Sequence, residues 1–539
     1  MLPPASPLPT RRADLIAQLA RDEEYDIAVV GGGATGLGVA LDAAARGLRV
    51  VLVESHDFAK GTSSRATKLV HGGVRYLAQG NISLVREALH ERTTLLHNAP
   101  YIAQPLGFVL PAYRWWDQWF YGIGLKVYDL LAGKAGLGKT RFLSQMQTLA
   151  ALPKLQSAGL YGGVKYWDGQ FNDARLAIAL ARTAAIHGAL LVNYCSATDL
   201  LYEAGKVSGL TCQDTLSGTP YTIRSRCVVN AAGVWVDTLR DKDSAAHQAA
   251  GGQAIRPMVA PSQGVHIVVD REFLGGETAL MVPKTADGRV LFAVPWLGKV
   301  ILGTTDTPRH DLDREPEPFV QELDFILSES ARYLVKAPTA ADIRSIWVGL
   351  RPLVKPPDDD GESTKALSRE HTVLASRSGL VTVTGGKWTT YRAMAQDVLE
   401  KCTSLGLLRG GAPCSTAHLP LVGVGAAEDV APRSLNEGPG EHSYGAEAPL
   451  LHAMQGASVQ LCSGLTEAMV RFAARYEYAM TVEDVLARRS RLLFLDARLA
   501  ATLARRVGQI LLEETGQDPQ ISGFEALAAK YLELPTKKV

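Results

Sequence analysis

Three glycines near the start of the chain, Gly31, Gly33 and Gly36, have the spacing G-x-G-x-x-G. Without side chains, they let the backbone turn sharply, approach a pyrophosphate and pack a helix closely on its strand. The N-terminus of that helix would offer free N–H groups and a partial positive charge to phosphates. Glu54 follows at a distance where an acid can bind ribose hydroxyls. The spacing predicts a dinucleotide site, with a plain tight turn as the alternative.

The elements around these glycines form a predicted β-α-β unit. Residues 27–30 are an apolar strand that runs into the glycines, and the alanine-rich residues 37–46 favour a helix. Gly47 suits the left-handed backbone that ends a helix, and residues 49–53 predict a second strand. We therefore expect the glycine loop to lie between a strand and a helix N-terminus, as phosphate binding requires.

Two further predicted strands end in glycine turns far downstream. Residues 227–230 run into a turn at Gly233, and residues 380–383 run into the glycine pair before Lys387. An extended FAD molecule needs binding elements from several chain segments, so this interrupted pattern favours FAD over NAD. The turn at Gly233 could be purely structural, whereas a glycine pair at a helix start can lie over an anionic flavin edge.

The chain has 539 residues, which is too many for a single hydrophobic core. With 47% hydrophobic and 21% charged residues, its composition is that of an ordinary globular protein. We expect an α/β fold in three parts. The FAD-binding domain is expected from residues 1–100, 190–255 and 340–408. A β-rich substrate domain is expected from residues 101–189 and 256–339, and a helical C-terminal domain from residues 409–539.

Charge and cysteine content exclude several classes of protein. Lysine and arginine number 56 against 55 acidic residues, so general nucleic-acid binding is not expected. The six cysteines contain no C-x-x-C pair, so we expect neither a cysteine metal site nor a disulfide framework. This cysteine pattern favours a protein of a reducing compartment. No apolar run reaches the length of a membrane span, and the proline-rich start is not a secretory signal.

Several longer motifs occupy residues 31–36, 61–65, 68–77, 303–307, 349–353, 385–392 and 482–489. Together they resemble the motifs of the FAD-dependent, respiratory glycerol-3-phosphate dehydrogenase family. The resemblance implies a Rossmann-like FAD-binding domain of the glutathione-reductase and D-amino-acid-oxidase type. It also implies oxidation of sn-glycerol 3-phosphate to dihydroxyacetone phosphate, with electrons passing through FAD to a membrane quinone.

The resemblance assigns the substrate phosphate to Arg75, Arg369 and Lys387, with Tyr76 as a hydroxyl donor. Cations suit this role because a guanidinium fork binds phosphate with paired, charge-assisted hydrogen bonds. For any single arginine the alternative is a surface ion pair, and this alternative is strongest for Arg369.

The resemblance also supplies candidates for the chemical step. Removing the C2 hydroxyl proton needs a base within hydrogen-bond reach, and His266 matches a family active-site histidine. Arg351 matches an arginine beside the substrate oxygen, where it would stabilise a developing alkoxide. The reverse assignment is disfavoured because arginine almost never deprotonates in proteins. A satisfied core residue is the alternative for His266, and His71 is expected to contact the flavin or order its loop.

A further set of residues is expected to hold FAD. It comprises Gly31, Gly33, Gly36, Glu54, Thr62, Ser63, Ser64, Lys68, His71, Gly233, Gly386, Lys387 and Thr389. Trp388 fills a position that the family's motif leaves variable, and its bulk could alter the flavin environment.

Three other functions compete with a quinone-linked dehydrogenase. An oxidase that reduces oxygen would share the whole site. A flavoprotein that oxidises an amine or amino acid would need carboxylate pairing without this array of phosphate cations. A flavin-binding scaffold would not need His266 or Arg351.

Two motifs lie outside this set. Residues 133–140 fit the phosphate-loop pattern, but the residues before them read as helix, so we expect a basic loop there. Trp115, Trp116, Trp119, Phe120 and Tyr121, followed by Lys126, could lie at a membrane interface or pack in a core or subunit interface. We expect a cytoplasmic protein, peripheral on the inner face of the cytoplasmic membrane, with a homodimer also possible.

The C-terminal part is expected to be helical over residues 465–532, with Thr481 and Asp484 at the spacing of a helix start. The proline- and glycine-rich residues 410–445 are expected to form a linker or an irregular connection.

Overall fold

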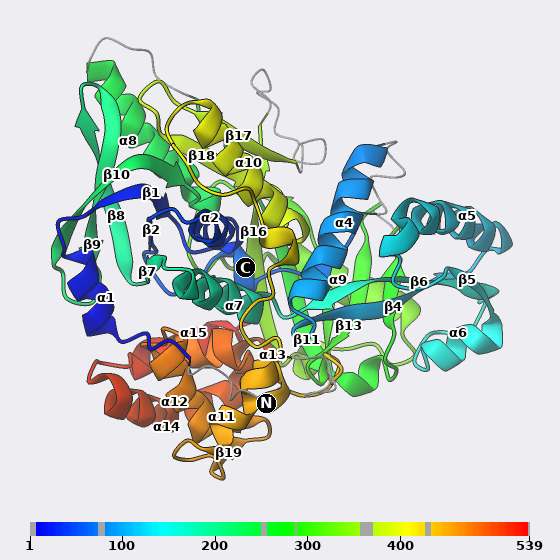
Figure 1. The fold of residues 1–539 in the computed structure, drawn as a ribbon. Coiled ribbons are helices and arrows are strands. Elements are labelled where there is room, and N and C mark those ends of the chain that lie inside the picture. The colour runs from blue at the N-terminus through cyan, green and yellow to red at the C-terminus, as the bar shows by residue number, and fades with distance from the viewer. Residues whose placement is uncertain are drawn as a thin grey trace.

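The computed structural model describes residues 7–73, 81–249, 256–285, 288–355, 370–425 and 433–536. Figure 1 shows two sheets with their helices and a helical lobe formed by the C-terminal part of the chain. Three predicted substrate residues, Arg75, Tyr76 and Arg369, lie outside the described residues.

The predicted β-α-β unit is confirmed. It consists of β1 (Glu24–Val30), α2 (Ala34–Ala45) and β2 (Val50–Val53), and a short helix, α1 (Arg12–Leu19), precedes it. The two strands are parallel; all β2 residues and most β1 residues are buried, as expected for a sheet covered on both faces.

The first sheet is assembled from three distant parts of the chain. Its strands run in the order β17-β18-β10-β1-β2-β7, and β8 and β9 extend it beside β10. The added strands are β7 (Leu190–Val192), β8 (Cys195–Glu203), β9 (Lys206–Asp214), β10 (Pro220–Asn230), β17 (His371–Ala375) and β18 (Val381–Gly385). Because β1, β10 and β18 are parallel neighbours, the three predicted glycine turns meet at one edge of the sheet.

Helices cover this sheet closely. On one face α2 packs against α7 (Asp173–Ile186) and α10 (Tyr391–Ser404), within one buried apolar cluster. Figure 1 shows these three helices side by side. Next to β8 and β18 lies α8 (Val236–Ala249). The parallel sheet assembled from distant glycine turns, which the sequence predicts, is therefore confirmed.

A second, larger sheet lies beside the first. Its order is β15-β11-β14-β13-β12-β4-β6-β3, with β16 beside β11 and β5 beside β6. Its strands are β3 (Leu69–Val70), β4 (Ala103–Ala112), β5 (Arg141–Ser144), β6 (Gly162–Phe171), β11 (Val259–Asp270), β12 (Ala279–Val282), β13 (Leu291–Trp296), β14 (Lys299–Gly303), β15 (Thr307–Pro308) and β16 (Ser345–Val354).

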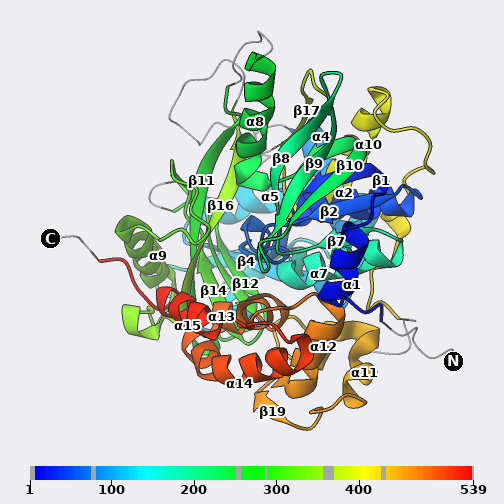
Figure 2. The same cartoon turned by 90° about the vertical axis from the view of Figure 1, so that its left-hand side faces the viewer.

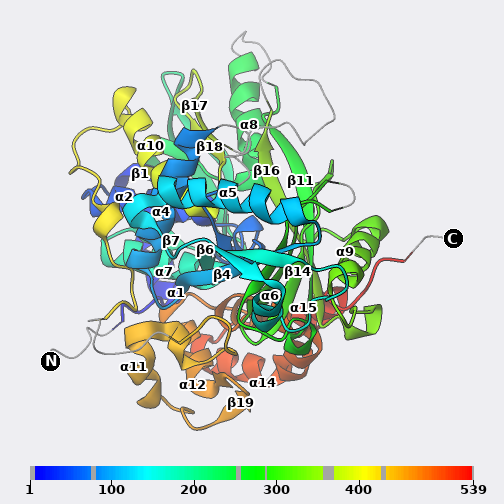
Figure 3. The same cartoon turned by 90° about the vertical axis from the view of Figure 1, so that its right-hand side faces the viewer.

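Four helices accompany the second sheet. They are α4 (Ile82–Asn98), α5 (Trp115–Ala132), α6 (Gln145–Ala151) and α9 (Val320–Tyr333). Figure 3 shows α5 running across the near face of the molecule. No helix among the described residues is both long and apolar enough to cross a membrane.

Two elements belong to a different sheet from the one that the expected domain boundaries assign to them. β16 lies in a segment expected to join the FAD-binding domain, yet it pairs along its whole length with β11 of the second sheet. α7 lies in a segment expected to join the substrate domain, yet it packs on α2. Each of these two expected segments therefore contributes elements to both halves of the molecule. The division of the chain into these domains stays a prediction.

The C-terminal part is helical, as predicted. It contains α11 (Ala448–His452), a small hairpin of β19 (Gln460–Cys462) and β20 (Leu465–Thr466), and the helices α12 (Glu467–Tyr476), α13 (Leu492–Leu495), α14 (Ala497–Thr515) and α15 (Ile521–Lys530). Figure 2 shows this lobe beneath both sheets. Its buried apolar residues form a core that includes Trp296 and Trp347 of the second sheet, so the lobe is docked tightly.

The two local motifs take the predicted forms. Thr481 Oγ1 accepts the Asp484 N–H at 3.3 Å, and the Asp484 carboxylate accepts the Thr481 N–H at 2.9 Å, which is a helix-start exchange. Residues 133–140 follow helix α5 and lead into strand β5. This is the reverse of the strand-loop-helix order that a phosphate loop needs, so the loop there is not a nucleotide site.

Candidate active site

A cavity of about 870 Å³ lies where the glycine turns of the first sheet face the second sheet. This volume falls within the range of small-molecule and cofactor sites. Most predicted site residues within the described ranges line it: Gly31, Gly33, Glu54, Thr62, Ser63, His71, Gly233, His266, Arg351, Gly386, Lys387 and Thr389. The structure therefore brings together residues that are more than 300 positions apart in the chain.

The three motif glycines have different structural roles. Gly31 has φ +110°, and a Cβ there would lie 2.6 Å from the Ala231 carbonyl oxygen. A Cβ on Gly36 would lie 1.9 Å from the Gly31 carbonyl oxygen, so this glycine lets the helix pack on its strand. A Cβ on Gly33 would meet only Ser63 Oγ, at 3.0 Å, because Gly33 faces the cavity. Gly36 itself does not line the cavity.

Glu54 stands at the end of β2, where the sequence placed a ribose-binding acid. One of its carboxylate oxygens accepts the Gly32 N–H at 2.7 Å, and the other accepts the His56 N–H at 2.9 Å. The backbone of the glycine loop thus holds the carboxylate at the cavity wall. An acid fixed in this way fits the hydroxyls of a nucleotide ribose.

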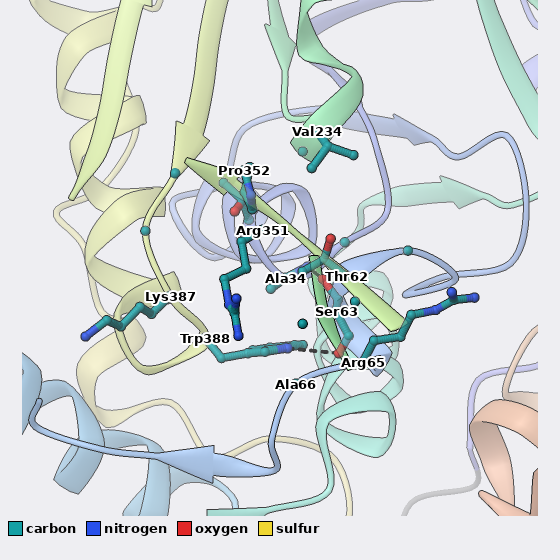
Figure 4. Close-up of a pocket in the computed structure, with 18 of the residues that line it drawn as sticks. Ala34, Thr62, Ser63, Arg65, Ala66, Val234, Arg351, Pro352, Lys387 and Trp388 are labelled. Atoms are coloured by element: carbon teal, nitrogen blue, oxygen red, sulfur yellow. Dashed lines mark hydrogen bonds between the residues drawn. The ribbon is translucent and has the colours of Figure 1, made fainter. Parts of the chain in front are cut away.

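The segment 61–65 joins three parts of the cavity wall. Ser63 Oγ accepts the Ala34 N–H at 2.9 Å, at the first turn of α2. Thr62 Oγ1 donates to the Leu350 carbonyl oxygen of β16 at 2.5 Å, and the Trp388 indole N–H donates to the Ser63 carbonyl oxygen at 2.9 Å (Figure 4). These hydrogen bonds fix the glycine loop, the second sheet and the 385–392 motif relative to one another.

The glycine pair before Lys387 shapes the opposite wall. Gly386 has φ +70°, and a Cβ there would lie 2.4 Å from Met394 Sδ. Thr389 Oγ1 accepts the His71 N–H at 3.2 Å, which connects this wall to the 68–77 motif. In Figure 4 the Lys387 side chain extends away from Arg351 and Trp388, whereas Arg351 points toward the Trp388 indole.

His266 and Arg351 lie on neighbouring antiparallel strands, β11 and β16, of the second sheet. The His266 ring is 2% exposed, its Nε2 lies 2.9 Å from Thr67 Oγ1, and it stacks on Trp347 at 4.2 Å. Burial, followed by the charges of Lys68 and Arg351, holds the pKa of His266 well below its ordinary value. A neutral imidazole at this position can accept a proton.

The Arg351 guanidinium is held by two side chains of the 303–307 motif, which follow strand β14. Its two terminal nitrogens donate to Asp306 and Thr304, each at 3.2 Å. Asp306 also accepts the Ser262 hydroxyl. These hydrogen bonds fix the orientation of the guanidinium. Arg351 lines the cavity, so its positive charge can stabilise a developing anion there.

Two of the predicted cofactor residues lie behind the wall rather than on it. Lys68 is completely buried and forms an ion pair of 2.6 Å with Asp173. Its ammonium also donates to the Ser64 carbonyl oxygen at 2.8 Å. Ser64 does not line the cavity either. Both residues support the 61–65 segment from behind, and a direct contact with the cofactor stays a prediction.

Other cavity residues were not predicted from the sequence. The Trp235 indole N–H donates to the Leu312 carbonyl oxygen at 3.0 Å, and the Arg314 guanidinium lies 3.7 Å from the Trp235 ring centre. Trp235, Arg314 and Lys242 all line the cavity. No motif marks Arg314 or Lys242; the Gly233 turn, just before Trp235, was the one available signal.

The described residues fit FAD. Gly33 provides a cradle that a side chain would fill, the first turn of α2 faces the cavity, and Glu54 is fixed at the cavity wall. Cationic side chains line the same cavity, among them Lys60, Arg314 and Arg351. Backbone N–H groups at a helix N-terminus, a ribose-binding acid and a cavity with excess positive charge match a dinucleotide diphosphate.

Comparisons with known proteins agree with this geometry. Residues 26–392 match the DAO family of FAD dependent oxidoreductases, and residues 414–521 match the C-terminal domain of alpha-glycerophosphate oxidase. The chain is 40% identical over 541 residues to the mitochondrial glycerol-3-phosphate dehydrogenase of Mus musculus, across 94% of this chain and 72% of that one. It is 38% identical over 579 residues to the mitochondrial glycerol-3-phosphate dehydrogenase SDP6 of Arabidopsis thaliana, across 98% and 89%.

Solved structures give the same result. The glycerol-3-phosphate dehydrogenase from Bacillus halodurans, complexed with FAD, matches with a TM-score of 0.76 and 29% identity over 98% of this chain and 99% of that chain. The L-alpha-glycerophosphate oxidase from Mycoplasma pneumoniae matches with a TM-score of 0.56 and 17% identity over 73% and 98%, which shows a shared fold.

Proposed function

The chain belongs to the family of FAD-dependent glycerol-3-phosphate dehydrogenases, and we infer from this premise how its site works. It oxidises sn-glycerol 3-phosphate to dihydroxyacetone phosphate with FAD as cofactor. One observation connects this chemistry to the chain. His266 and Arg351 face the same cavity as the glycine cradle, so a base and an anion-stabilising cation lie beside the cofactor site.

When bound, FAD supplies the acceptor for the hydride that leaves C2 of the substrate. We assign the accompanying proton to Nε2 of His266, because this atom lies beside the Thr67 hydroxyl whereas Nδ1 is buried without a partner among the described residues. Removal of the hydroxyl proton leaves negative charge on the substrate oxygen, and Arg351 is placed to stabilise it. The stacked Trp347 keeps the His266 ring in place and excludes water from one face.

The substrate phosphate needs several cations, and we propose Lys387 together with Arg75 and Arg369 for this role. Lys387 lines the cavity, and the other two lie outside the described residues. In the described conformation the Lys387 side chain extends away from Arg351, and we propose that it changes rotamer to bind the phosphate. Such changes are common when polar side chains meet a ligand.

We propose a quinone as the electron acceptor and a peripheral contact with the inner face of the cytoplasmic membrane. The exposed face of α5 supports the contact. Phe120 is 73% exposed and Leu130 is 80% exposed, and Trp115, Trp116, Trp119, Ile123 and Val127 on the same helix are exposed as well. Exposed Lys126, Lys134 and Lys139 lie on and after this helix. Aromatic and apolar side chains with flanking lysines favour the interface of an anionic bilayer.

A self-association through the same face of α5 would instead give the homodimer that the sequence also allows. The large exposed apolar area needs a covering surface of some kind in water. Analytical ultracentrifugation with and without anionic vesicles distinguishes the two: a monomer that sediments with vesicles supports the membrane contact. A dimer that does not bind vesicles contradicts it.

The activity is tested with a substrate and acceptor screen on the FAD-loaded protein. We expect turnover with sn-glycerol 3-phosphate and none with glycerol or with glycine, because the site holds cations for a phosphate. Turnover with a quinone analogue but little peroxide from oxygen would support the quinone proposal, and stoichiometric peroxide would identify an oxidase. We expect His266→Ala to slow flavin reduction by about 10²–10⁴-fold, and an unchanged rate would assign the base elsewhere.

A further inference from the structure

A group of completely buried charges lies behind His266. Lys68, Asp173 and Arg491 are each 0% exposed. Asp173 accepts the Lys68 ammonium at 2.6 Å and forms an ion pair of 3.2 Å with the Arg491 guanidinium. Two cations thus share one carboxylate in the interior, which we call the Lys68–Asp173–Arg491 cluster. Buried charges are costly, so an unbalanced group of this kind calls for a reason.

Aromatic rings surround the Lys68 ammonium. It lies 4.7 Å from the ring centre of Trp347, 5.3 Å from that of Trp296 and 5.4 Å from that of Phe494. Ring faces attract cations, and the ion pair with Asp173 also favours the charged form. Burial, reinforced by the charge of Arg491, holds the pKa of Lys68 well below its ordinary value, while the Asp173 carboxylate favours the ammonium form. Burial lowers the pKa of Arg491 to about 10, so this guanidinium stays charged at neutral pH.

Trp347 connects this cluster to the site. Trp347 and His266 are directly paired across β16 and β11, and their rings are stacked at 4.2 Å with an angle of 18° between them. The same indole is the nearest ring to the Lys68 ammonium. The Lys68 ammonium and the His266 ring therefore both contact the buried Trp347 side chain.

The charged groups that face His266 are cations. Arg351 approaches from β16, paired with Asp306, and Lys68 approaches from the segment after Ser64. Thr67, from the same segment, contributes a neutral hydroxyl to Nε2. The carboxylates nearby, Asp306 and Asp173, are each engaged by an arginine or lysine. A proton on His266 would add another positive charge to this group.

We propose that Lys68 is a positioning residue of the reaction: through Trp347, the Lys68–Asp173–Arg491 cluster holds His266 in its neutral, proton-accepting form. This inference rests on the role given to His266 in the proposed function. Lys68 does not line the cavity, so it would act on His266 through its charge and its packing against Trp347. The direction of the pKa shift of His266 agrees with it.

The test compares the pH dependence of flavin reduction by sn-glycerol 3-phosphate in FAD-loaded proteins. Lys68→Met removes the charge and keeps an unbranched apolar chain. We expect the acidic limb of the profile to move to higher pH by about one unit, because losing a nearby cation favours the protonated imidazole. Lys68→Arg, which keeps the charge, should restore the midpoint. Lys165→Met is the matched control: its ammonium lies 4.8 Å from the Trp167 ring centre, and it does not line the cavity.

A second readout is independent of turnover. In holoenzyme labelled at the histidine rings, the NMR titration of the His266 resonance, assigned with His266→Asn, should shift in the same direction in Lys68→Met. If Lys68→Met does not fold, Lys68→Gln removes the charge but keeps a polar side chain that can donate a hydrogen bond to Asp173, and it must move both measurements the same way. Unmoved midpoints in folded, FAD-loaded variants would overturn the inference. Absence of flavin reduction in the parent protein would instead refute the proposed function.

Discussion

The Trp388 indole N–H donates a hydrogen bond of 2.9 Å to the carbonyl oxygen of Ser63, a residue 325 positions earlier in the chain. This bond joins the 385–392 motif to the segment beside the glycine loop. The indole also packs edge-on against Phe171 and Tyr391, at 5.6 Å and 5.9 Å between ring centres. Trp388 therefore closes the cavity wall on the side where the two motifs meet.

Replacing Trp388 with phenylalanine keeps a ring and removes the donor. We expect Trp388→Phe to weaken FAD binding about five- to tenfold, because a net hydrogen bond contributes about 1 kcal/mol. Equilibrium dissociation of FAD, followed by flavin fluorescence, measures this change. Trp116→Phe, on the exposed face of α5, is the control and should leave the affinity unchanged. An unaltered affinity in Trp388→Phe would show that the bond does not support the cofactor site.

The glycine motif should respond differently at two of its positions. Gly36→Ala places a methyl group 1.9 Å from the Gly31 carbonyl oxygen, so we expect loss of folded protein. Gly33→Val faces the cavity, so we expect a folded protein that lacks FAD and is colourless. Far-UV circular dichroism and the flavin absorbance separate these results. A yellow Gly33→Val protein would contradict the cradle.

Lys387→Ala tests the phosphate site. We expect KM for sn-glycerol 3-phosphate to rise at least tenfold with FAD still bound, since a charged hydrogen bond contributes about 1.5–3 kcal/mol. Steady-state kinetics and the flavin absorbance measure the two effects. Lys299→Ala, which removes an ion pair with Asp270 outside the cavity, should leave KM unchanged. An unchanged KM in Lys387→Ala would show that other cations bind the substrate phosphate.

The contact between the C-terminal lobe and the nucleotide sheet should be acid-sensitive. Burial raises the pKa of Glu483, but the Arg488 and Lys60 charges outweigh it and hold that pKa well below its ordinary value. Such a carboxylate stabilises the fold fully above its unfolded pKa of about 4.3, and the stabilisation is lost as the pH falls below that value.

We therefore expect Glu483→Gln to lower the free energy of unfolding by about 1–3 kcal/mol at pH 7, with a smaller difference at pH 3. Urea unfolding at several pH values measures this. Glu441→Gln, whose partner His452 is exposed, is the control and should change little. A Glu483→Gln protein with the parent's pH slope would refute the assignment.

The exposed face of α5 should control vesicle binding. We expect the double substitution Phe120→Ser with Leu130→Ser to reduce co-sedimentation with anionic vesicles about tenfold or more, because each large apolar side chain contributes about 1.5–3 kcal/mol when buried. Turnover with a water-soluble acceptor should be unchanged. Met146→Ser, an exposed apolar side chain on α6, is the control. Undiminished binding by the double variant would place the membrane contact elsewhere.

Much of the nucleotide site was predictable from the sequence because its chemistry depends on local spacing. The glycines, the strand before them and Glu54 lie within one short β-α-β unit, and each appears where its pattern predicts. The turn at Gly233 and the glycine pair before Lys387 could be connected to that unit because parallel strands bring their turns to one edge.

Other parts could not be predicted because they depend on tertiary contacts. Arg314 lies in a segment of irregular backbone and contacts the Trp235 ring. No local sequence pattern predicts this contact. Lys68 sits in a motif with many site residues, so its place behind the wall is visible only when Asp173 and Arg491 are seen beside it. Residues 340–408, which contain β16, are expected to belong to the FAD-binding domain, yet β16 pairs with β11 of the second sheet.

The central claim is that sn-glycerol 3-phosphate delivers a hydride to FAD held in this cavity. The most direct measurement is anaerobic titration of the purified holoprotein with sn-glycerol 3-phosphate while the oxidised flavin absorbance is recorded. We expect the absorbance to bleach completely with one equivalent of dihydroxyacetone phosphate formed per flavin. A protein that binds no flavin, or a bound flavin that keeps its oxidised spectrum with excess substrate, would contradict the claim.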